Sequence, residues 1–148
     1  MAEAASFVID ASVGAKVVLE EEGSAEAEAM LLHWQGAGPR SFHVPDHFYL
    51  ECGTALRKAI LRGVLPAEVA RERLLDLCEM EVEVADARGL AADALAIAGD
   101  AGLSVYDAAY VALSDLTGAP LVTADRRLHE RLRRTGHRVL GLWEVPAA

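Results

Sequence analysis

The sequence lacks several features that would assign it to a familiar class of protein. It has two cysteines in 148 residues, Cys52 and Cys78, and their spacing matches neither a disulfide framework nor a zinc site. We expect both to be small buried hydrophobic residues. No uncharged run approaches the about 18 to 20 apolar residues of a membrane span, and no basic segment followed by an apolar core opens the chain. These absences predict a cytoplasmic protein that does not contact a membrane.

Positive charge is also scarce. The chain has 23 acidic side chains against 14 lysines and arginines, and its formal net charge is −9. Such an excess disfavours a polyanionic partner such as RNA and favours a basic protein partner. Cations bound at a cluster of acids would neutralise part of the charge, so the excess weakens a nucleic-acid hypothesis without excluding it.

Common catalytic motifs are missing as well. The chain has no glycine-rich phosphate loop, and residues 102–106 (GLSVY) lack the last glycine of a serine-hydrolase nucleophile elbow. His43 and His47 are four residues apart but lie on either side of Pro45. This position makes a shared metal-binding face improbable, so we predict structural roles for both histidines.

The chain does contain a regular alternation of short apolar runs and helical segments. Strands are predicted at residues 6–10, 42–44, 80–84, 121–123 and 139–143, and helices at residues 11–21, 24–34, 45–63, 66–78, 88–100, 104–116 and 125–135. This alternation predicts a single α/β domain over residues 1–148, a three-layer α/β/α sandwich around a mostly parallel sheet of about five strands. Acids alternate with apolar residues in 80–84, which suits a strand at a sheet edge.

Four carboxylates interrupt apolar stretches in which packing gives no reason for a charge: Asp10, Glu51, Asp107 and Asp125. Asp10 ends the first strand, Asp125 follows the fourth, and Asp107 opens a helix, which are positions where ligand sites of parallel sheets form. Glu51 lies on the apolar stripe of its helix. Carboxylate oxygens suit Mg²⁺ or Mn²⁺ and poorly suit zinc or copper. The pattern therefore predicts metal-dependent phosphodiester hydrolysis, with all four acids as metal ligands and catalytic residues.

Each acid also has a purely structural explanation. Asp10 could cap the following helix, and Ser104-x-x-Asp107 matches a capping box. Glu51 could be neutralised by a nearby arginine in a buried ion pair. Asp125 could be a first-turn acid stabilised by the helix dipole. A single site that contains all four acids explains them more simply than four separate structural roles. In such a site a divalent cation would relieve the repulsion between the carboxylates.

Four blocks of the sequence resemble the signature blocks of PIN-domain nucleases, and more narrowly of VapC-type toxins. They are residues 8–12 (VIDAS), 48–51 (FYLE), 104–112 (SVYDAAYVA) and 121–128 (LVTADRRL). The resemblance spans nearly the whole chain, and the third and fourth blocks are the most specific.

This resemblance implies a Mg²⁺- or Mn²⁺-dependent endoribonuclease with an RNA substrate. It also implies a homodimer that is silenced by a small cognate antitoxin protein. Asp10 and Asp107 would hold the principal ion, and Glu51 and Asp125 would complete the site. Hydroxyl groups near the first and fourth acids would support metal or water, a role that falls here to Ser12 and Thr123.

Two surface features leave alternatives open. The arginines at 126, 127, 131, 133 and 134 form a basic run that is either a solvated helix face or a contact for the RNA backbone, with Arg126 beside the proposed site. A further apolar set would serve a dimer or antitoxin surface, although core packing is its commoner use. This set is Leu31, Leu32, Trp34, Leu61 and Val64.

Other functions remain as alternatives. A PIN-like nuclease could act in RNA processing outside a toxin–antitoxin pair, and a PIN-like fold could be a non-catalytic partner-binding module. A phosphatase of the haloacid dehalogenase kind also places an aspartate after the first strand. It needs a second acid at position 12, where this chain has Ser12, and a late lysine, whereas none follows Lys58.

Overall fold

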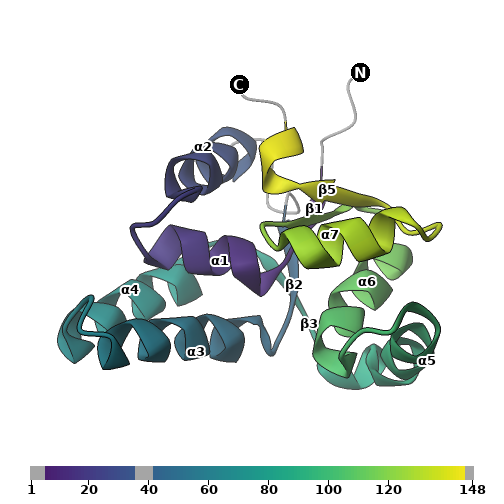
Figure 1. The fold of residues 1–148 in the computed structure, drawn as a ribbon, viewed down its shortest axis with the longest axis horizontal. Coiled ribbons are helices and arrows are strands. Elements are labelled where there is room, and N and C mark those ends of the chain that lie inside the picture. The colour runs from purple at the N-terminus through teal and green to yellow at the C-terminus, as the bar shows by residue number, and fades with distance from the viewer. Residues whose placement is uncertain (1–5, 36–41, 146–148) are drawn as a thin grey trace.

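The fold is built on a sheet of five strands that all run parallel (Figure 1). A computed structural model describes residues 6–35 and 42–145 of the chain. The sheet order is β3-β2-β1-β4-β5, and the strands are β1 (Phe7–Ile9), β2 (Phe42–Pro45), β3 (Glu83–Ala85), β4 (Leu121–Thr123) and β5 (Val139–Gly141). Because every strand is parallel, all five carboxyl ends lie along one edge of the sheet. The predicted α/β sandwich with a central parallel sheet is confirmed.

Seven α-helices within the described residues flank this sheet. They are α1 (Ala11–Val18), α2 (Ser24–Gln35), α3 (Phe48–Leu61), α4 (Ala67–Glu79), α5 (Ala91–Ala101), α6 (Val105–Thr117) and α7 (Arg126–Arg133), with short 3-10 turns η1 (Ala87–Gly89) and η2 (Leu142–Glu144). In Figure 1, α1 to α4 lie to one side of the central strands and α5 to α7 to the other. Strands β1, β2 and β4 are almost wholly buried. The edge strand predicted at 80–84 is β3, which begins only at Glu83, and Val84 is 51% exposed, so the expected single wet face is wrong.

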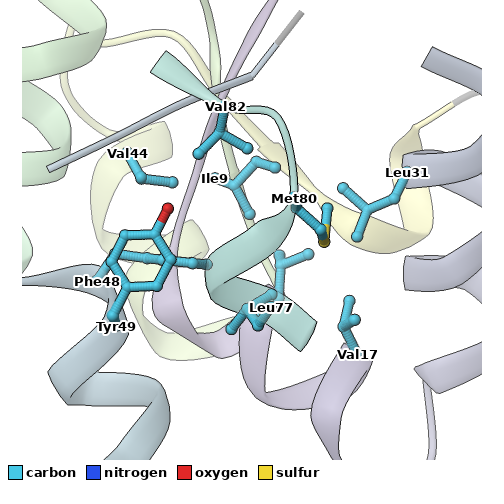
Figure 2. Close-up of a pocket in the computed structure, with 11 residues that line it drawn as sticks. Ile9, Val17, Leu31, Val44, Phe48, Tyr49, Leu77, Met80 and Val82 are labelled. Carbon is cyan, nitrogen blue, oxygen red and sulfur yellow. The ribbon is translucent and has the colours of Figure 1, made fainter. Parts of the chain in front are cut away.

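The core between the sheet and the first four helices is closely packed. Figure 2 shows side chains from β1, β2, α1, α3 and the end of α4 converging on one apolar space. Its open volume is about 10 Å³, which is at the lower limit for a single water molecule. Helix α1 approaches α3 through Gly14, where a Cβ would lie 2.5 Å from the Cys52 sulfur and 2.7 Å from the Phe48 ring. The start of α1 is thereby fixed against α3.

Glycines explain where α5 and α6 end, and α6 is followed by β4. Gly102 ends α5 and Gly118 ends α6, both with a left-handed backbone that glycine adopts without strain. Ser104 begins α6 by accepting a hydrogen bond from the Asp107 backbone N–H at 3.1 Å. The predicted cap of this helix is confirmed.

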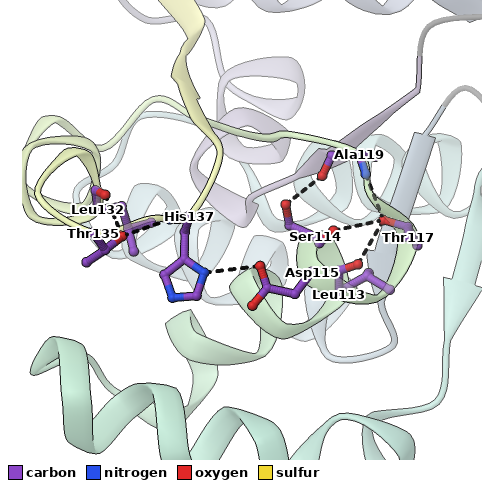
Figure 3. A network of polar contacts seen from close by, with 8 residues as sticks. All are labelled: Leu113, Ser114, Asp115, Thr117, Ala119, Leu132, Thr135 and His137. Carbon is purple, nitrogen blue, oxygen red and sulfur yellow. Dashed lines mark hydrogen bonds and ion pairs between the residues drawn. The ribbon is translucent and has the colours of Figure 1, made fainter.

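Polar contacts fasten the end of α6 to the segment that follows α7 (Figure 3). The Ser114 hydroxyl donates to the Ala119 carbonyl at 2.5 Å, and the Thr117 hydroxyl donates to the Leu113 carbonyl at 2.8 Å. Between the two segments, His137 Nδ1, after α7, lies 3.1 Å from a carboxylate oxygen of Asp115 on α6. These contacts fix the turn into β4, which carries Thr123 and leads to Asp125.

Several predicted boundaries are wrong in detail. Helix α1 ends at Val18 and not near residue 21, because Glu20, Glu21 and Glu22 would place three negative charges at the negative end of the helix dipole. The last strand stops at Gly141 and continues as η2, since the Trp143 ring folds back over Gly141, where a Cβ would collide with it.

The expected burial of some apolar residues is also wrong. Cys52 is buried, but Cys78 is exposed on α4. Leu31 belongs to the core, whereas Leu32, Leu61 and Val64 are each more than three-fifths exposed. The prediction for the side chain of Trp34 falls outside the described residues. Helical spacing places such residues on a face, but only tertiary packing decides whether that face is covered. Among the described helices, none has the length and apolar character needed to cross a membrane.

Candidate active site

All four predicted acids lie at the carboxyl edge of the sheet. Asp10 directly follows β1, and Asp125 follows β4 by one residue. Glu51 lies in the first turn of α3, which begins just beyond the end of β2. Asp107 lies in the first turn of α6, the helix that runs back along the sheet and leads into β4. The fold therefore brings to one edge acids that are far apart along the chain.

Asp10 is the most deeply buried of the four, with 5% of its surface exposed. It occupies the N-cap position of α1, but its side chain caps no helical N–H. Instead, the Ser12 hydroxyl donates to Asp10 Oδ2 at 2.5 Å, and the Thr123 hydroxyl donates to the same oxygen at 2.9 Å. The capping explanation for this residue is therefore wrong. Within the described residues, the structure gives no hydrogen bond to its second oxygen.

Ser12 and Thr123 also tie the loop after β4 to the start of α1. Ser12 Oγ accepts from the Ala124 backbone N–H at 2.9 Å, and Thr123 Oγ1 accepts from the Asp125 backbone N–H at 3.0 Å. The two hydroxyl oxygens are 3.1 Å apart. Both residues therefore orient Asp10 and fix the backbone of Asp125 at the same time.

Burial raises the pKa of Asp10 from an ordinary value of 3.8 to about 6. The hydrogen bonds from Ser12 and Thr123 oppose this rise, and the negative charges of Asp107 and Glu51 add to it. The pKa of Asp107 is raised as well, first by burial and then by the charges of Glu51 and Asp125. The Ser104 hydroxyl lowers it. These mutual effects mean that the four carboxylates act on one another electrostatically.

Glu51 is held by two side chains that the sequence does not single out. The Tyr110 hydroxyl donates to Glu51 Oε1 at 2.8 Å, and Tyr110 is fully buried. His47 Nε2 lies 3.2 Å from the same oxygen, one helical turn earlier on α3. This nitrogen is buried, and its contact with Glu51 falls short of ideal hydrogen-bond geometry. The contact with Glu51 raises the pKa of His47.

These contacts correct two expectations. Glu51 has a basic partner, but it is a histidine, which carries charge only when protonated, and not an arginine. His47 is part of the site and does not have only a structural role, and its ring packs edge-on against Tyr106 and Tyr110. Two features of the sequence could have indicated these contacts. His47 is four residues before Glu51, a spacing that brings side chains together on a helix, and a buried tyrosine such as Tyr110 needs an acceptor for its hydroxyl.

Asp125 acts as the helix cap that its position allows. One of its oxygens accepts from the Arg127 and Leu128 backbone N–H groups, at 2.9 and 3.2 Å. The side chain is exposed, and its second oxygen accepts no hydrogen bond within the described residues. Capping and proximity to Asp107 therefore coexist in this residue.

The donor set fits a hard divalent cation by its chemistry. Asp10, Glu51 and Asp125 each present one oxygen held by the protein and one without a hydrogen bond in the described residues. The acids are hard oxygen ligands with no cysteine among them. As the side chains stand in the described ranges, no three His, Cys, Asp or Glu groups are close enough together to hold an ion.

An open groove of about 610 Å³ adjoins the site on the side of α3. Of the four acids, Glu51 alone lines it, together with Ser12, His47 and Tyr106, and Lys58 lies along its wall. The groove opens the half-buried Glu51 carboxylate to solvent.

The basic run on α7 is exposed, and part of it is used within the chain. Arg133 and Arg134 pair with Glu130, each at 3.6 Å, and Arg131 donates to the Gly102 carbonyl. These contacts agree with a solvated helix face. Arg126 instead stacks on the Trp143 ring, 4.1 Å from its centroid.

Comparison with known proteins identifies the family. Residues 7–134 match the family model of the PIN domain, so the chain belongs to the PIN-domain family. It is 36% identical over 127 residues to Ribonuclease VapC3 of Pyrobaculum aerophilum, a match that covers 84% of this chain and 93% of that protein. The resemblance to VapC-type proteins that the sequence blocks predict is thus confirmed.

Two solved structures share the fold. A crystal structure of PAE2754 from Pyrobaculum aerophilum superposes with a TM-score of 0.70 at 23% identity, over 95% of this chain and 85% of that one. A toxin-antitoxin complex from Klebsiella pneumoniae gives a TM-score of 0.64 at 15% identity, over 95% of this chain and 100% of that one. Family membership also removes the phosphatase alternative.

Proposed function

We propose that the protein is a Mg²⁺- or Mn²⁺-dependent endoribonuclease that acts as the toxin of a toxin–antitoxin pair. The observation that carries the proposal is Asp10, whose pKa is raised to about 6 by burial and, to a smaller extent, by the charges of Asp107 and Glu51. Three acids that destabilise one another by repulsion are readily explained if a cation offsets their charge. Family membership and the relative named Ribonuclease VapC3 support the same reaction.

The site residues have different proposed roles in hydrolysis. Asp10 and Asp107 would hold the principal ion, and Glu51 and Asp125 would complete its shell or orient the attacking water. A bound divalent ion supplies an activated water and stabilises the charge that develops on the phosphoryl oxygens. Ser12 and Thr123 keep Asp10 Oδ2 in place, which leaves its other oxygen free to point at the ion. Tyr110 does the same for Glu51.

The partner proteins belong to the proposal too. The neighbour from Klebsiella pneumoniae was solved as a toxin-antitoxin complex, and the net charge of −9 favours a basic antitoxin. We also expect a homodimer and a cytoplasmic location. A short adjacent reading frame whose product has a basic tail, binds this protein and blocks cleavage would support the toxin role. Without such an inhibitor, RNA processing becomes the better assignment.

The test of the reaction is cleavage of a mixed RNA pool by the purified protein with Mg²⁺ or Mn²⁺. Asp107→Asn should keep the fold and reduce cleavage to background, because a carboxamide binds these cations poorly. Asp76→Asn changes an exposed aspartate on α4 and is the matched control. Wild-type rates in Asp107→Asn, with the metal requirement unchanged, would contradict the assignment.

A further inference from the structure

A second hollow of about 350 Å³ lies beside the proposed site, between α1, the start of α2, the start of α7 and η2. Its walls include Ala124, Arg126 and Trp143, together with Lys16, Glu22 and Glu26. Ala124 connects the hollow to the acids, because its backbone N–H donates to Ser12, which in turn holds Asp10. Nothing in the reaction proposed above uses this hollow.

Trp143 is the unusual feature of the hollow. The residue is 41% exposed, so part of this large apolar side chain faces the hollow and not the core. The ring is also fixed in place. It folds over Gly141, which has no side chain to obstruct it, and meets the buried His129 ring edge-on with centroids 5.0 Å apart. His129 is itself paired with Glu144.

Arg126 adds a second planar group. Its guanidinium carbon lies 4.1 Å from the centroid of the Trp143 ring, in cation–π geometry. Arg126 directly follows Asp125, so the stacked pair is adjacent in sequence to one of the four acids. Aromatic rings and guanidinium planes are the groups on which proteins stack unpaired bases of RNA.

The charges of the hollow favour a base over a phosphate. Lys16 and Arg126 are cationic, but Glu22 and Glu26 line the same space, and Lys16 is already 3.4 Å from Glu21. A phosphate would meet as many negative as positive side chains. A nucleobase is neutral, stacks on the planar groups, and has N–H donors that carboxylates accept.

We propose that the hollow formed by Trp143, Arg126 and Ala124 is a binding subsite for one nucleobase of the RNA next to the cleaved phosphate. The proposal rests on the proposed function, since it assigns part of the substrate of the same site. Arg126 covers one face of the Trp143 ring, so the base stacks on the outer face of the guanidinium, and Trp143 holds that guanidinium in place.

Binding can be measured apart from cleavage. The chain has two tryptophans, so Trp34→Phe leaves Trp143 as the only one, and Asp107→Asn prevents turnover. In this background, titration with an eight-nucleotide single-stranded RNA of mixed sequence should quench Trp143 fluorescence. Trp143→Ala should weaken binding, measured by anisotropy of a labelled octamer, by about 5- to 150-fold, which is the range for loss of one base stack. Trp143→Phe should restore most of the affinity.

Abasic RNA identifies the contact as a base. In a series of octamers that each lack the base at one position, one member should bind more weakly to the protein carrying Trp34→Phe and Asp107→Asn, called the parent. With that octamer, adding Trp143→Ala should not weaken binding further. Leu95→Ala removes an exposed apolar side chain from α5, away from the hollow, and should leave affinity unchanged. If Trp143→Ala does not fold, Trp143→Leu keeps an apolar side chain without the aromatic face and serves the same purpose.

The results separate the two proposals. Cleavage by the wild-type protein, combined with equal octamer affinity of the parent and Trp143→Ala, would overturn the subsite and leave the nuclease assignment intact. A wild-type protein that neither cleaves nor binds RNA would overturn both.

Discussion

Replacing Asp10 by asparagine should make the protein more stable in the absence of metal, although it should also abolish activity. The substitution removes a charge whose side chain is almost fully buried, and the asparagine oxygen can accept from Ser12 and Thr123 where Oδ2 does now. Both hydroxyls donate to a single oxygen, so the hydrogen bonds survive. What is lost is the cost of ionising a buried group beside Asp107 and Glu51.

The magnitude follows from the pKa of Asp10. A rise from 3.8 to about 6 corresponds to about 3 kcal/mol, at about 1.4 kcal/mol for each tenfold change in the protonation equilibrium. Because the pKa is higher in the folded state, the folded protein binds more protons than the unfolded chain between about pH 4 and pH 6. Wild-type stability therefore falls as the pH rises through this window. Burial of the new amide group offsets part of the gain, so about 3 kcal/mol is an upper value.

The assay is urea unfolding in EDTA at several pH values between 4 and 8. The stability of Asp10→Asn relative to the wild type should grow from pH 4 to pH 6 and stay constant above pH 7. For a chain of this length the full gain corresponds to a melting temperature higher by several degrees. Asp76→Asn, on the exposed face of α4, should show no such pH dependence. A relative stability of Asp10→Asn that is negative or independent of pH would refute the reasoning.

Three further predictions follow from the same structure. Tyr110→Phe removes the hydrogen bond to Glu51 and should weaken Mn²⁺ binding about tenfold or more by calorimetry, while Tyr49→Phe, as control, should leave it unchanged. Protons compete with the cation for Asp10, so the apparent Mn²⁺ affinity should fall below about pH 6, by up to about tenfold per pH unit from this group, and level off above pH 7; a flat profile would contradict its role as a ligand. Gly14→Ala places a Cβ 2.5 Å from the Cys52 sulfur and should cost about 1 to 3 kcal/mol in urea unfolding, and an unchanged midpoint would show that α1 and α3 can separate.

The order of the elements could be predicted because its signals are local. Short apolar runs bounded by Gly102, Ser104 and Gly118 define the helices that precede β4, and the structure has them within a few residues of the predicted ends. The placement of Asp10 and Asp125 followed from the same signals, since a residue after a parallel strand lies at the carboxyl edge.

Contacts that depend on tertiary packing could not be read in this way. The pairing of Glu51 with Tyr110 joins residues 59 apart in sequence, and it requires α3 and α6 to meet across the end of the sheet. The exposure of Cys78 and Leu61 depends on which helix faces remain uncovered by neighbours. Local pattern carries no information on either point.

A position at a helix N-terminus and a role in the proposed site are compatible for all four acids, although the Asp10 side chain itself caps no helical N–H. Asp10 and Asp125 occupy N-cap positions of α1 and α7, and Glu51 and Asp107 lie in the first turns of α3 and α6. Four helices thus direct the positive ends of their dipoles at one edge of the sheet, and each offsets part of the cost of a nearby carboxylate. This arrangement lets the chain fold with the acids close together, yet the raised pKa values of Asp10 and Asp107 mean that the offset is incomplete. In the proposed function, a divalent cation would relieve this remaining repulsion, and the helix ends that make each acid tolerable for the fold would then also place the acids where the ion binds.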